Sequence, residues 1–287
     1  MLILIQPLKS QWLDKQTLNA TVLLEKVEKN GFPPYGTGFL YYNYENTPDN
    51  IVVTCAHLVK GKKIISVRVN PDTSLINILT EQEKKGTIIQ NVLIEENSIR
   101  FIVDLTETPV YIHPTLDIAA FTFKIPALYS NGEQLKLANF LFIPKSAVKQ
   151  RSEISLGDEV YFIGFPLGYG AFKYVEPIVR SGSVAWMPRE ESVFLLDAFS
   201  YGGNSGSPIF QKNIVGSKPG ELSWSETKLM GMVVGHQSIK LENMLNQPNP
   251  DELKFEVTDV DLNIGLARCV YTDDIDFVIE NLKKKMK

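Results

Sequence analysis

Cysteine and histidine are scarce in this sequence, and it has neither a long apolar run nor a strong charge imbalance. Its 287 residues include two cysteines and three histidines, and the formal net charge is −4. No spacing of these residues matches a zinc site. No stretch approaches the roughly 20 apolar residues of a membrane span, and the small charge does not favour a nucleic-acid partner. We therefore predict no metal, no cofactor, no nucleic acid and no membrane contact.

The beginning of the sequence and its cysteines bear on the cellular compartment. The apolar run from Met1 ends early at Pro7, with no basic segment and no small-residue cleavage site of a secretory signal. Cys55 lies in an apolar run, and we expect a free, packed thiol there. Together these features predict a cytoplasmic protein in a reducing environment.

The most informative segment is 203–210, Gly-Asn-Ser-Gly-Ser-Pro-Ile-Phe. Glycine permits a sharp or left-handed backbone that would crowd a residue with a Cβ. Such a bend can expose the Ser205 hydroxyl and gather backbone N–H groups in a small space, as a nucleophile with an oxyanion hole requires. A glycine-rich turn that closes a hairpin is the alternative interpretation.

Two further residues lie in distinctive local patterns upstream. His57 follows the apolar run 51–56, which predicts a buried strand before it, and Asp117 precedes the apolar run 118–121. Taken alone, each is typical of a structural residue: a histidine at a strand end, or an aspartate in a turn. The order His, Asp, Ser, each within its own pattern, favours a catalytic set.

These and other motifs resemble the trypsin-like serine protease superfamily, and most closely its bacterial branch, which includes the heat-shock serine proteases. The resemblance covers roughly residues 20 to 270. The matching segments, in chain order, are 36–40, 54–57, 117–119, 157–160 with 164–168, 180–184, 203–206 and 230–235. The order of all these segments, more than any single one, carries the resemblance.

The resemblance implies a role for each matched position. Ser205 would attack an acyl carbon, and His57 would take its proton and later pass it to the leaving amine. Asp117 would orient the imidazole and stabilise its charged form. The N–H groups of Gly203 and Ser205 would hold the oxyanion. The implied substrate is a protein or a peptide.

The resemblance also implies the walls of a substrate pocket. They comprise Phe199, Ser200 and Tyr201 on one side and Val233, Val234, Gly235 and His236 on the other. No negatively charged residue occupies the base, so a preference for Lys or Arg is not expected. His236 with Ser200 favours an acidic side chain, Phe199 with Val233 favours an apolar one, and a solvent-facing His236 without any role is equally compatible.

Two residues depart from the family pattern. Ser207 replaces the usual glycine, and we expect local repacking with activity retained. Asn204 stands where secreted zymogens carry an aspartate that pairs with a newly cut amino terminus. A neutral side chain cannot form that ion pair, so we do not expect activation by N-terminal cleavage. Regulation is expected at the loops 168–170 and 201–202, with a regulatory protein partner as one possibility.

The predicted fold is all-β, with two antiparallel six-stranded barrels, as the resemblance implies, and a C-terminal helix. The predicted units are a first barrel over 1–130, a linker over 131–155, a second barrel over 156–270 and a helix over 271–287. The short β-branched runs and turn signals support strands, and the apolar stripe of 273–287 has the helical period. The predicted strands are 21–28, 38–44, 50–54, 64–69, 87–95, 100–104 and 118–123, then 159–164, 173–178, 182–187, 193–197, 207–211 and 229–237.

Three functions from different classes fit the sequence. The first is a serine endopeptidase that works through an acyl-enzyme. The second is a pseudoprotease that serves as a peptide-binding scaffold, and the complete set of His57, Asp117 and Ser205 argues against it. The third is a hydrolase of small esters or amides, to which an open edge strand is less suited. The segment 242–256 is interpreted as a surface insertion, with a lid or docking loop as the alternative.

Overall fold

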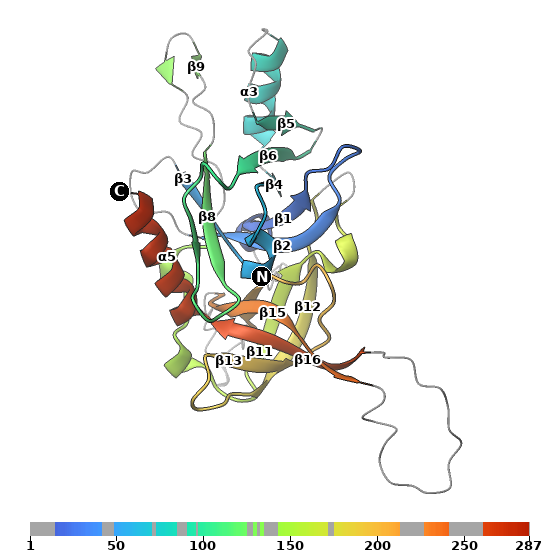
Figure 1. The fold of residues 1–287 in the computed structure, drawn as a ribbon, viewed down its shortest axis with the longest axis vertical. Helices are drawn as coiled ribbons and strands as arrows, with labels where there is room; N and C mark the ends of the chain where they lie inside the picture. The colour runs from blue at the N-terminus through green and yellow to red at the C-terminus, as the bar shows by residue number, and fades with distance from the viewer. Residues whose placement is uncertain are drawn as a thin grey trace, which may run out of the picture.

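The computed structural model of the chain consists mainly of β-strands that form two packed units with one long helix at their side (Figure 1). The structure describes residues 15–41, 49–70, 73–84, 91–95, 97–124, 129–130, 133–134, 143–171, 175–212, 227–240 and 261–286.

The first unit is an eight-stranded antiparallel sheet in the order β5-β6-β4-β1-β2-β3-β8-β7. Its central strands bury nearly every side chain, as expected for β-branched and aromatic sequences that pack on both faces. The strands are β1 (Thr21–Lys26), β2 (Pro34–Tyr41), β3 (Asp49–Thr54), β4 (Ile64–Val69), β5 (Val92–Ile94), β6 (Ile99–Asp104), β7 (Val110–Ile112) and β8 (Ala119–Lys124).

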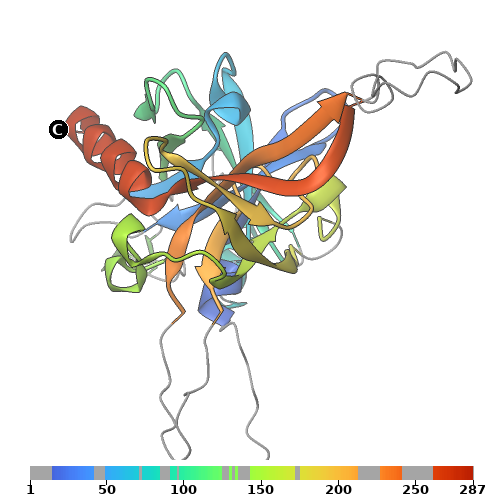
Figure 2. The same cartoon turned by 90° about the horizontal axis from the view of Figure 1, so that it is seen from below.

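The second unit is a closed barrel of six strands in the order β11-β12-β13-β16-β15-β14. Figure 2 shows its last two strands side by side along most of their length. The strands are β11 (Glu159–Gly164), β12 (Ile178–Trp186), β13 (Val193–Asp197), β14 (Pro208–Gln211), β15 (Leu229–Lys240) and β16 (Asp261–Tyr271). A short pair, β9 (Tyr129–Ser130) and β10 (Glu133–Gln134), lies between the two units in the sequence.

The helices of the described residues are few. They are α1 (Lys15–Asn19), α2 (Ala56–Val59), α3 (Thr73–Lys84), α5 (Thr272–Met286) and the 3₁₀ turns η1 (Lys145–Ala147), η2 (Arg151–Glu153) and η3 (Pro166–Gly168). None of these helices combines the length and the apolar character that crossing a membrane requires.

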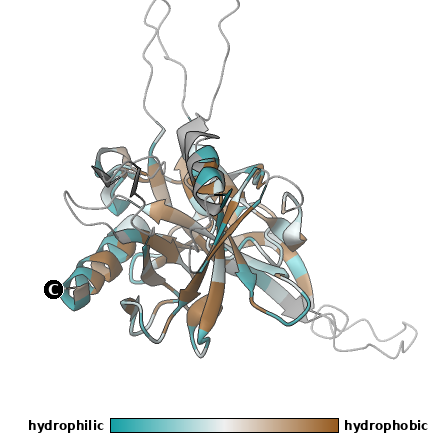
Figure 3. Cartoon of the chain, turned by 90° about the horizontal axis from the view of Figure 1, so that it is seen from above, coloured by the Kyte–Doolittle hydropathy of each residue, from teal (hydrophilic) through white to brown (hydrophobic). Residues whose placement is uncertain are grey.

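Helix α5 follows the second barrel in sequence but also packs against β7 and β8 of the first sheet. Its apolar stripe, coloured brown in Figure 3, is buried at Ile275, Val278, Ile279 and Leu282. The hydroxyl of Tyr41 donates to Asp276 Oδ1 (2.6 Å), and Lys285 Nζ donates to the carbonyl of Val110 (2.8 Å). The helix therefore fastens the two units together.

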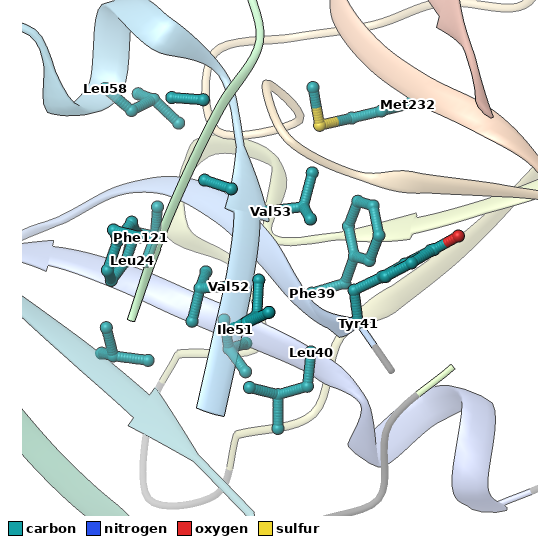
Figure 4. Close-up of a cluster of buried hydrophobic side chains, with 14 of the residues drawn as sticks. Leu24, Phe39, Leu40, Tyr41, Ile51, Val52, Val53, Leu58, Phe121 and Met232 are labelled. Carbon is teal, nitrogen blue, oxygen red and sulfur yellow. The ribbon is translucent and has the colours of Figure 1, made fainter. Parts of the chain in front are cut away.

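The two units share one large hydrophobic core. Met232 of β15 lies beside Val53 and Phe39 of the first sheet (Figure 4), and Ile163 and Phe210 belong to the same cluster. All five side chains are at most 1% exposed. The interface between the units is thus part of one hydrophobic core. Residues anchored in this core are held in fixed positions.

The structure confirms the predicted all-β, two-barrel fold class and the C-terminal helix. The first sheet has eight strands, not the six expected, because short strands at Val92–Ile94 and Val110–Ile112 extend its two edges. The predictions 64–69, 159–164 and 193–197 coincide with β4, β11 and β13.

Other local predictions differ from the structure. Of the strand predicted at 173–178, residues 173–174 lie outside the described residues, 175–177 are irregular, and only Ile178 is in a strand. Ile178 begins β12, which also contains most of the strand predicted at 182–187. Helix α3 and strand β16 were not predicted. The prediction of an insertion or lid at 242–256 lies outside the described residues.

Candidate active site

His57 is presented by a one-turn helix at the end of a buried strand. Strand β3 ends at Thr54, and α2 spans Ala56–Val59. The apolar side chains of α2 face the core, whereas 48% of the His57 side chain is exposed. Burial of its neighbours therefore turns the imidazole toward solvent at the junction of the two units.

Asp117 lies in the turn between β7 and β8, which is shaped by a second histidine. Nδ1 of His113 accepts the main-chain N–H groups of Thr115 (3.2 Å) and Leu116 (2.9 Å). The His113 ring also packs edge-on against Phe277 of α5, with the ring centroids 5.2 Å apart. His113 thus fixes the turn that carries Asp117.

Asp117 and His57 form two hydrogen bonds. The main-chain N–H of His57 donates to Oδ1 (2.9 Å), and Nδ1 of the ring lies 2.6 Å from Oδ2. Partial burial acts to raise the pKa of the Asp117 carboxyl, but the hydrogen bonds from His57 outweigh it, and the pKa is lowered. An ionised carboxylate at this position holds the Nδ1–H tautomer and leaves Nε2 free to accept a proton.

Ser205 lies in a loop whose shape depends on two glycines. Gly203 and Gly206 have φ of 94° and 91°, in the left-handed region. A Cβ at Gly203 would overlap the carbonyl oxygen of Phe165, and one at Gly206 would overlap that of Thr37. Only glycine therefore fits on either side of Asn204 and Ser205, and the Ser205 residue remains half-buried.

The Ser205 loop is bound to the first sheet through Thr37 of β2. The Thr37 N–H donates to the carbonyl of Ser205 (2.9 Å), and its hydroxyl donates to the carbonyl of Gly203 (2.7 Å) and accepts the N–H of Phe165 (3.1 Å). The Thr54 hydroxyl, three residues before His57, donates to the carbonyl of Thr37 (2.6 Å). A chain of hydrogen bonds thus joins the segment before His57 to the loop of Ser205. Within the described part of the chain, Ser205 Oγ forms no hydrogen bond.

The main-chain N–H groups of Gly203 and Ser205 donate to no other described residue. The loop is closed instead by neighbouring bonds, from Asn204 N–H to the carbonyl of Tyr201 (3.0 Å) and from Ser207 N–H to that of Asn204 (2.9 Å). Two donors at Ser205 that have no partner among the described residues are what an oxyanion hole requires.

Two polar side chains next to Ser205 are buried and have no hydrogen-bond partner in the part of the chain that the structure describes. Asn204 is 1% exposed and Ser207 is 0% exposed. Neither the Asn204 side-chain amide nor the Ser207 hydroxyl forms a hydrogen bond with a described residue. A Cβ at Gly164 would overlap Ser207 Oγ. The extra side chain of Ser207 is therefore accommodated by a glycine opposite it.

The residues of the two predicted pocket walls do not all line one cavity. Phe199 and Tyr201 are exposed and stack with ring centroids 6.3 Å apart, while Ser200 is buried. Val233 is also buried. Val234, Gly235 and His236 instead line a cavity of about 360 Å³ with Asp117, and Phe199 to Tyr201 do not line this cavity.

One cluster of possible metal ligands overlaps this site. Cys55, His57 and Asp117 place a ligand atom each within 4.8 Å of one another. Complete burial, together with the Asp117 charge, raises the pKa of the Cys55 thiol, which donates to the carbonyl of Val233 (3.4 Å). Metal binding requires the thiolate, so this environment is unfavourable for an ion. Cys55 and Cys269 are both free thiols.

Three residues near the site were not predicted from the sequence: Thr37, His113 and Arg268, which lines the same cavity as Asp117. Thr37 lies within a matched motif, but its hydrogen bonds depend on a distant loop. His113 offered a local signal, because it lies four residues before Asp117 and a histidine ring nitrogen can accept the main-chain N–H groups of a turn that follows it. Arg268 gave no signal, because the strand that carries it, β16, was not predicted.

This arrangement of two β-units, with His57, Asp117 and Ser205 near their junction, defines a trypsin-like peptidase fold. The family profile of the trypsin-like peptidase domain matches residues 36–216, more than half of the chain, and the chain therefore belongs to this family. The matched range contains all three residues. The resemblance to the superfamily is confirmed, while the heat-shock branch stays a prediction.

Among solved structures, the chain is similar to the MamO protease domain from Magnetospirillum magneticum in its apo form. The identity is 16%, the match covers 92% of this chain and 98% of that chain, and the TM-score is 0.51. At this identity the similarity concerns the fold alone. No curated protein matches the chain.

Proposed function

We propose that the protein is a serine endopeptidase in which Ser205 is the nucleophile, His57 the general base and Asp117 the residue that orients it. The observation that carries the proposal is the pair of hydrogen bonds between His57 and Asp117, with Nδ1 of the ring 2.6 Å from Oδ2. This pair leaves Nε2 without a partner among the described residues, on a side chain that is 48% exposed.

In the proposed reaction, Ser205 Oγ bonds to the acyl carbon of a peptide as its proton passes to His57 Nε2. The carbonyl oxygen becomes an oxyanion that the N–H groups of Gly203 and Ser205 bind. His57 then protonates the departing amine as the C–N bond breaks, and water hydrolyses the acyl-enzyme by the same route. The substrate class is proteins or peptides. The cytoplasmic location remains a prediction, supported by the two free thiols.

A labelled fluorophosphonate probe tests the proposal, because it reacts covalently with activated serines. Labelling of the wild type is expected, with loss of labelling in Ser205→Ala and His57→Ala. Ser152→Ala, on the exposed surface of η2, is the matched control and should label normally. A folded wild type that is not labelled would favour the pseudoprotease scaffold. Cleavage of a peptide library, against turnover of simple esters alone, separates the endopeptidase from a small-ester hydrolase.

A further inference from the structure

The cavity beside Asp117 contains a cationic side chain that the proposed chemistry does not use. It lies between the turn of Asp117, strand β15 and strand β16, and its volume of about 360 Å³ accommodates a large side chain. Arg268 of β16 and His236 of β15 both line it. We call this cavity the Arg268 pocket.

Arg268 differs from the paired arginines of the protein. Arg68 and Arg100 form ion pairs with Glu25 and Glu95. Arg268 is exposed and forms no ion pair with a described residue. Its register partners, Leu195 and Gly235, carry no charge. No described residue therefore accepts a hydrogen bond from its five N–H donors, which can bind a ligand.

The one carboxylate in the lining of the pocket is already satisfied. Oδ1 and Oδ2 of Asp117 accept from the main chain and the ring of His57. The guanidinium of Arg268 is not within 4.0 Å of this carboxylate, since no ion pair joins them. The pocket lining thus carries one guanidinium without a partner among the described residues and one carboxylate whose oxygens already accept hydrogen bonds, above an apolar floor of Val193 and Val270, which are 6% and 0% exposed.

An extended peptide has a free strand edge that leads to this pocket. On the side of β15 that faces the Ser205 loop, the last backbone bonds join Val233 to Gly206 and Ser207. No described strand pairs with that edge beyond Val233, because β14 reaches only Met232. A peptide paired with residues 234–236 would cover about 10 Å at 3.3 Å per residue. The substrate residue that faces the pocket is then within about three residues of the one held at Ser205.

We propose that the Arg268 pocket selects an acidic side chain of the peptide substrate, which the guanidinium of Arg268 binds through its carboxylate. A guanidinium matches a carboxylate in a two-point hydrogen-bonded geometry, and the methylenes of the acidic side chain contact Val193 and Val270. The His236 imidazole adds a further donor at the rim. This inference rests on the proposed peptidase function and assigns it a substrate class.

The test compares peptides that differ only in Glu against Gln at each of the three positions on either side of the cleaved bond. At one position the wild type should cleave the Glu peptide with about 10-fold higher kcat/KM, the usual scale of a charge-assisted hydrogen bond. Arg268→Gln should abolish this preference, and Arg268→Glu should reverse it toward Lys. Arg189→Gln is the matched control, since Arg189 is exposed, loses the same charge and does not line the pocket. Equal kcat/KM for Glu and Gln in the wild type, or the same loss in Arg189→Gln, would overturn the proposal.

A second measurement keeps this inference separate from the proposed function. If the wild type labels with the fluorophosphonate but shows no acidic preference, the inference alone fails. If no peptide is cleaved, the peptidase function fails, and fluorescence anisotropy of the same labelled peptides on the wild type tests the pocket by itself. Weaker binding of the Glu peptide to Arg268→Gln than to Arg189→Gln would then support the pocket, and equal binding would refute it.

Discussion

The carboxylate of Asp117 accepts one hydrogen bond from the main-chain N–H of His57 and another from its ring, at 2.9 Å and 2.6 Å. The aspartate thereby fixes the helix turn that bears the imidazole as well as the ring itself. Asp117 therefore has two roles, since it positions the imidazole of His57 and supplies a negative charge beside it. The two roles can be measured separately.

Asp117→Asn should lower the rate of peptide cleavage by about 10,000-fold while the fold is kept, because an amide no longer enforces the Nδ1–H tautomer. Single-turnover kinetics and circular dichroism provide the measurement. Asp104→Asn is the control: Asp104 is an exposed carboxylate that accepts hydrogen bonds from Thr106. A fall of less than 10-fold in Asp117→Asn would contradict the proposed role.

His113 should make stability depend on pH. Partial burial lowers the pKa of His113, and its Nδ1 accepts two main-chain N–H groups, which protonation would disrupt. The unfolded chain therefore binds a proton more readily. The stabilisation by neutral His113 is present above its pKa in the unfolded chain, about 6.5. It is lost as the pH falls through its lower pKa in the folded protein. Urea unfolding between pH 5 and 8 measures it. His113→Asn, whose amide oxygen can accept the same N–H groups, should remove this part of the pH dependence; an unchanged profile would refute it.

Thr37→Val should weaken the link between the Ser205 loop and the first sheet. The variant removes one hydroxyl that donates to the carbonyl of Gly203 and accepts the N–H of Phe165. Each buried group left unsatisfied costs about 1–3 kcal/mol, so the free energy of unfolding should fall by a few kcal/mol. The rate of fluorophosphonate labelling should fall as well. Thr37→Ser keeps the hydroxyl and should recover most of both losses; if it does not, the methyl group is responsible.

Gly206→Ala should destabilise the protein far more than Gly61→Ala. Both glycines have positive φ, 91° and 75°, which costs about 1–2 kcal/mol for alanine. A Cβ at Gly61 meets no atom within 4 Å, whereas one at Gly206 overlaps the carbonyl oxygen of Thr37. Thermal unfolding of the pair therefore isolates the cost of the close approach. Equal decreases in Tm for Gly206→Ala and Gly61→Ala would mean that the Ser205 loop can move away from β2.

Substitutions of Asn204 should have opposite effects on stability. Its amide is buried and has no hydrogen-bond partner among the described residues, so Asn204→Leu should be neutral or stabilising. Asn204→Asp would bury a charge without a cation and should lower the free energy of unfolding by several kcal/mol. Denaturant unfolding of both variants is the measurement. A stable Asn204→Asp would indicate that a cation reaches this residue in solution.

The sequence predicted those parts of the fold that local pattern determines. Val193–Asp197 and Ile64–Val69 are apolar, β-branched runs between turn residues, and they are strands as expected. Strand β16 was missed because Asn263, Gly265 and Arg268 interrupt its apolar pattern. Its polar residues serve contacts with other segments, such as the bond from Asn263 Nδ2 to the carbonyl of Ser200 (2.6 Å).

The same distinction applies to the site. Ser205 and its flanking glycines could be recognised from the sequence because the backbone bend requires glycine locally. The role of Thr37 could not, because it arises from hydrogen bonds to Gly203 and Ser205, which are far away along the chain. The cavity that residues 234–236 share with Asp117 was also not predictable, since it depends on how β15 passes the turn of Asp117.

Helix α5 packs on the edge strand β7 of a sheet whose strands come much earlier in the sequence, and Lys285 donates to the carbonyl of Val110 there. It is also bound to strand β2 of that sheet, through Tyr41 and Asp276. During synthesis on a ribosome, β7 and β8 emerge before helix α5. Their packing with the helix can form only after the chain has been translated as far as Met286. The first half of the protein therefore reaches its final packing only after the second half is made. The proposed active site, which draws residues from both units, is consequently a late product of folding, and the proposed proteolytic activity would be delayed in the nascent chain.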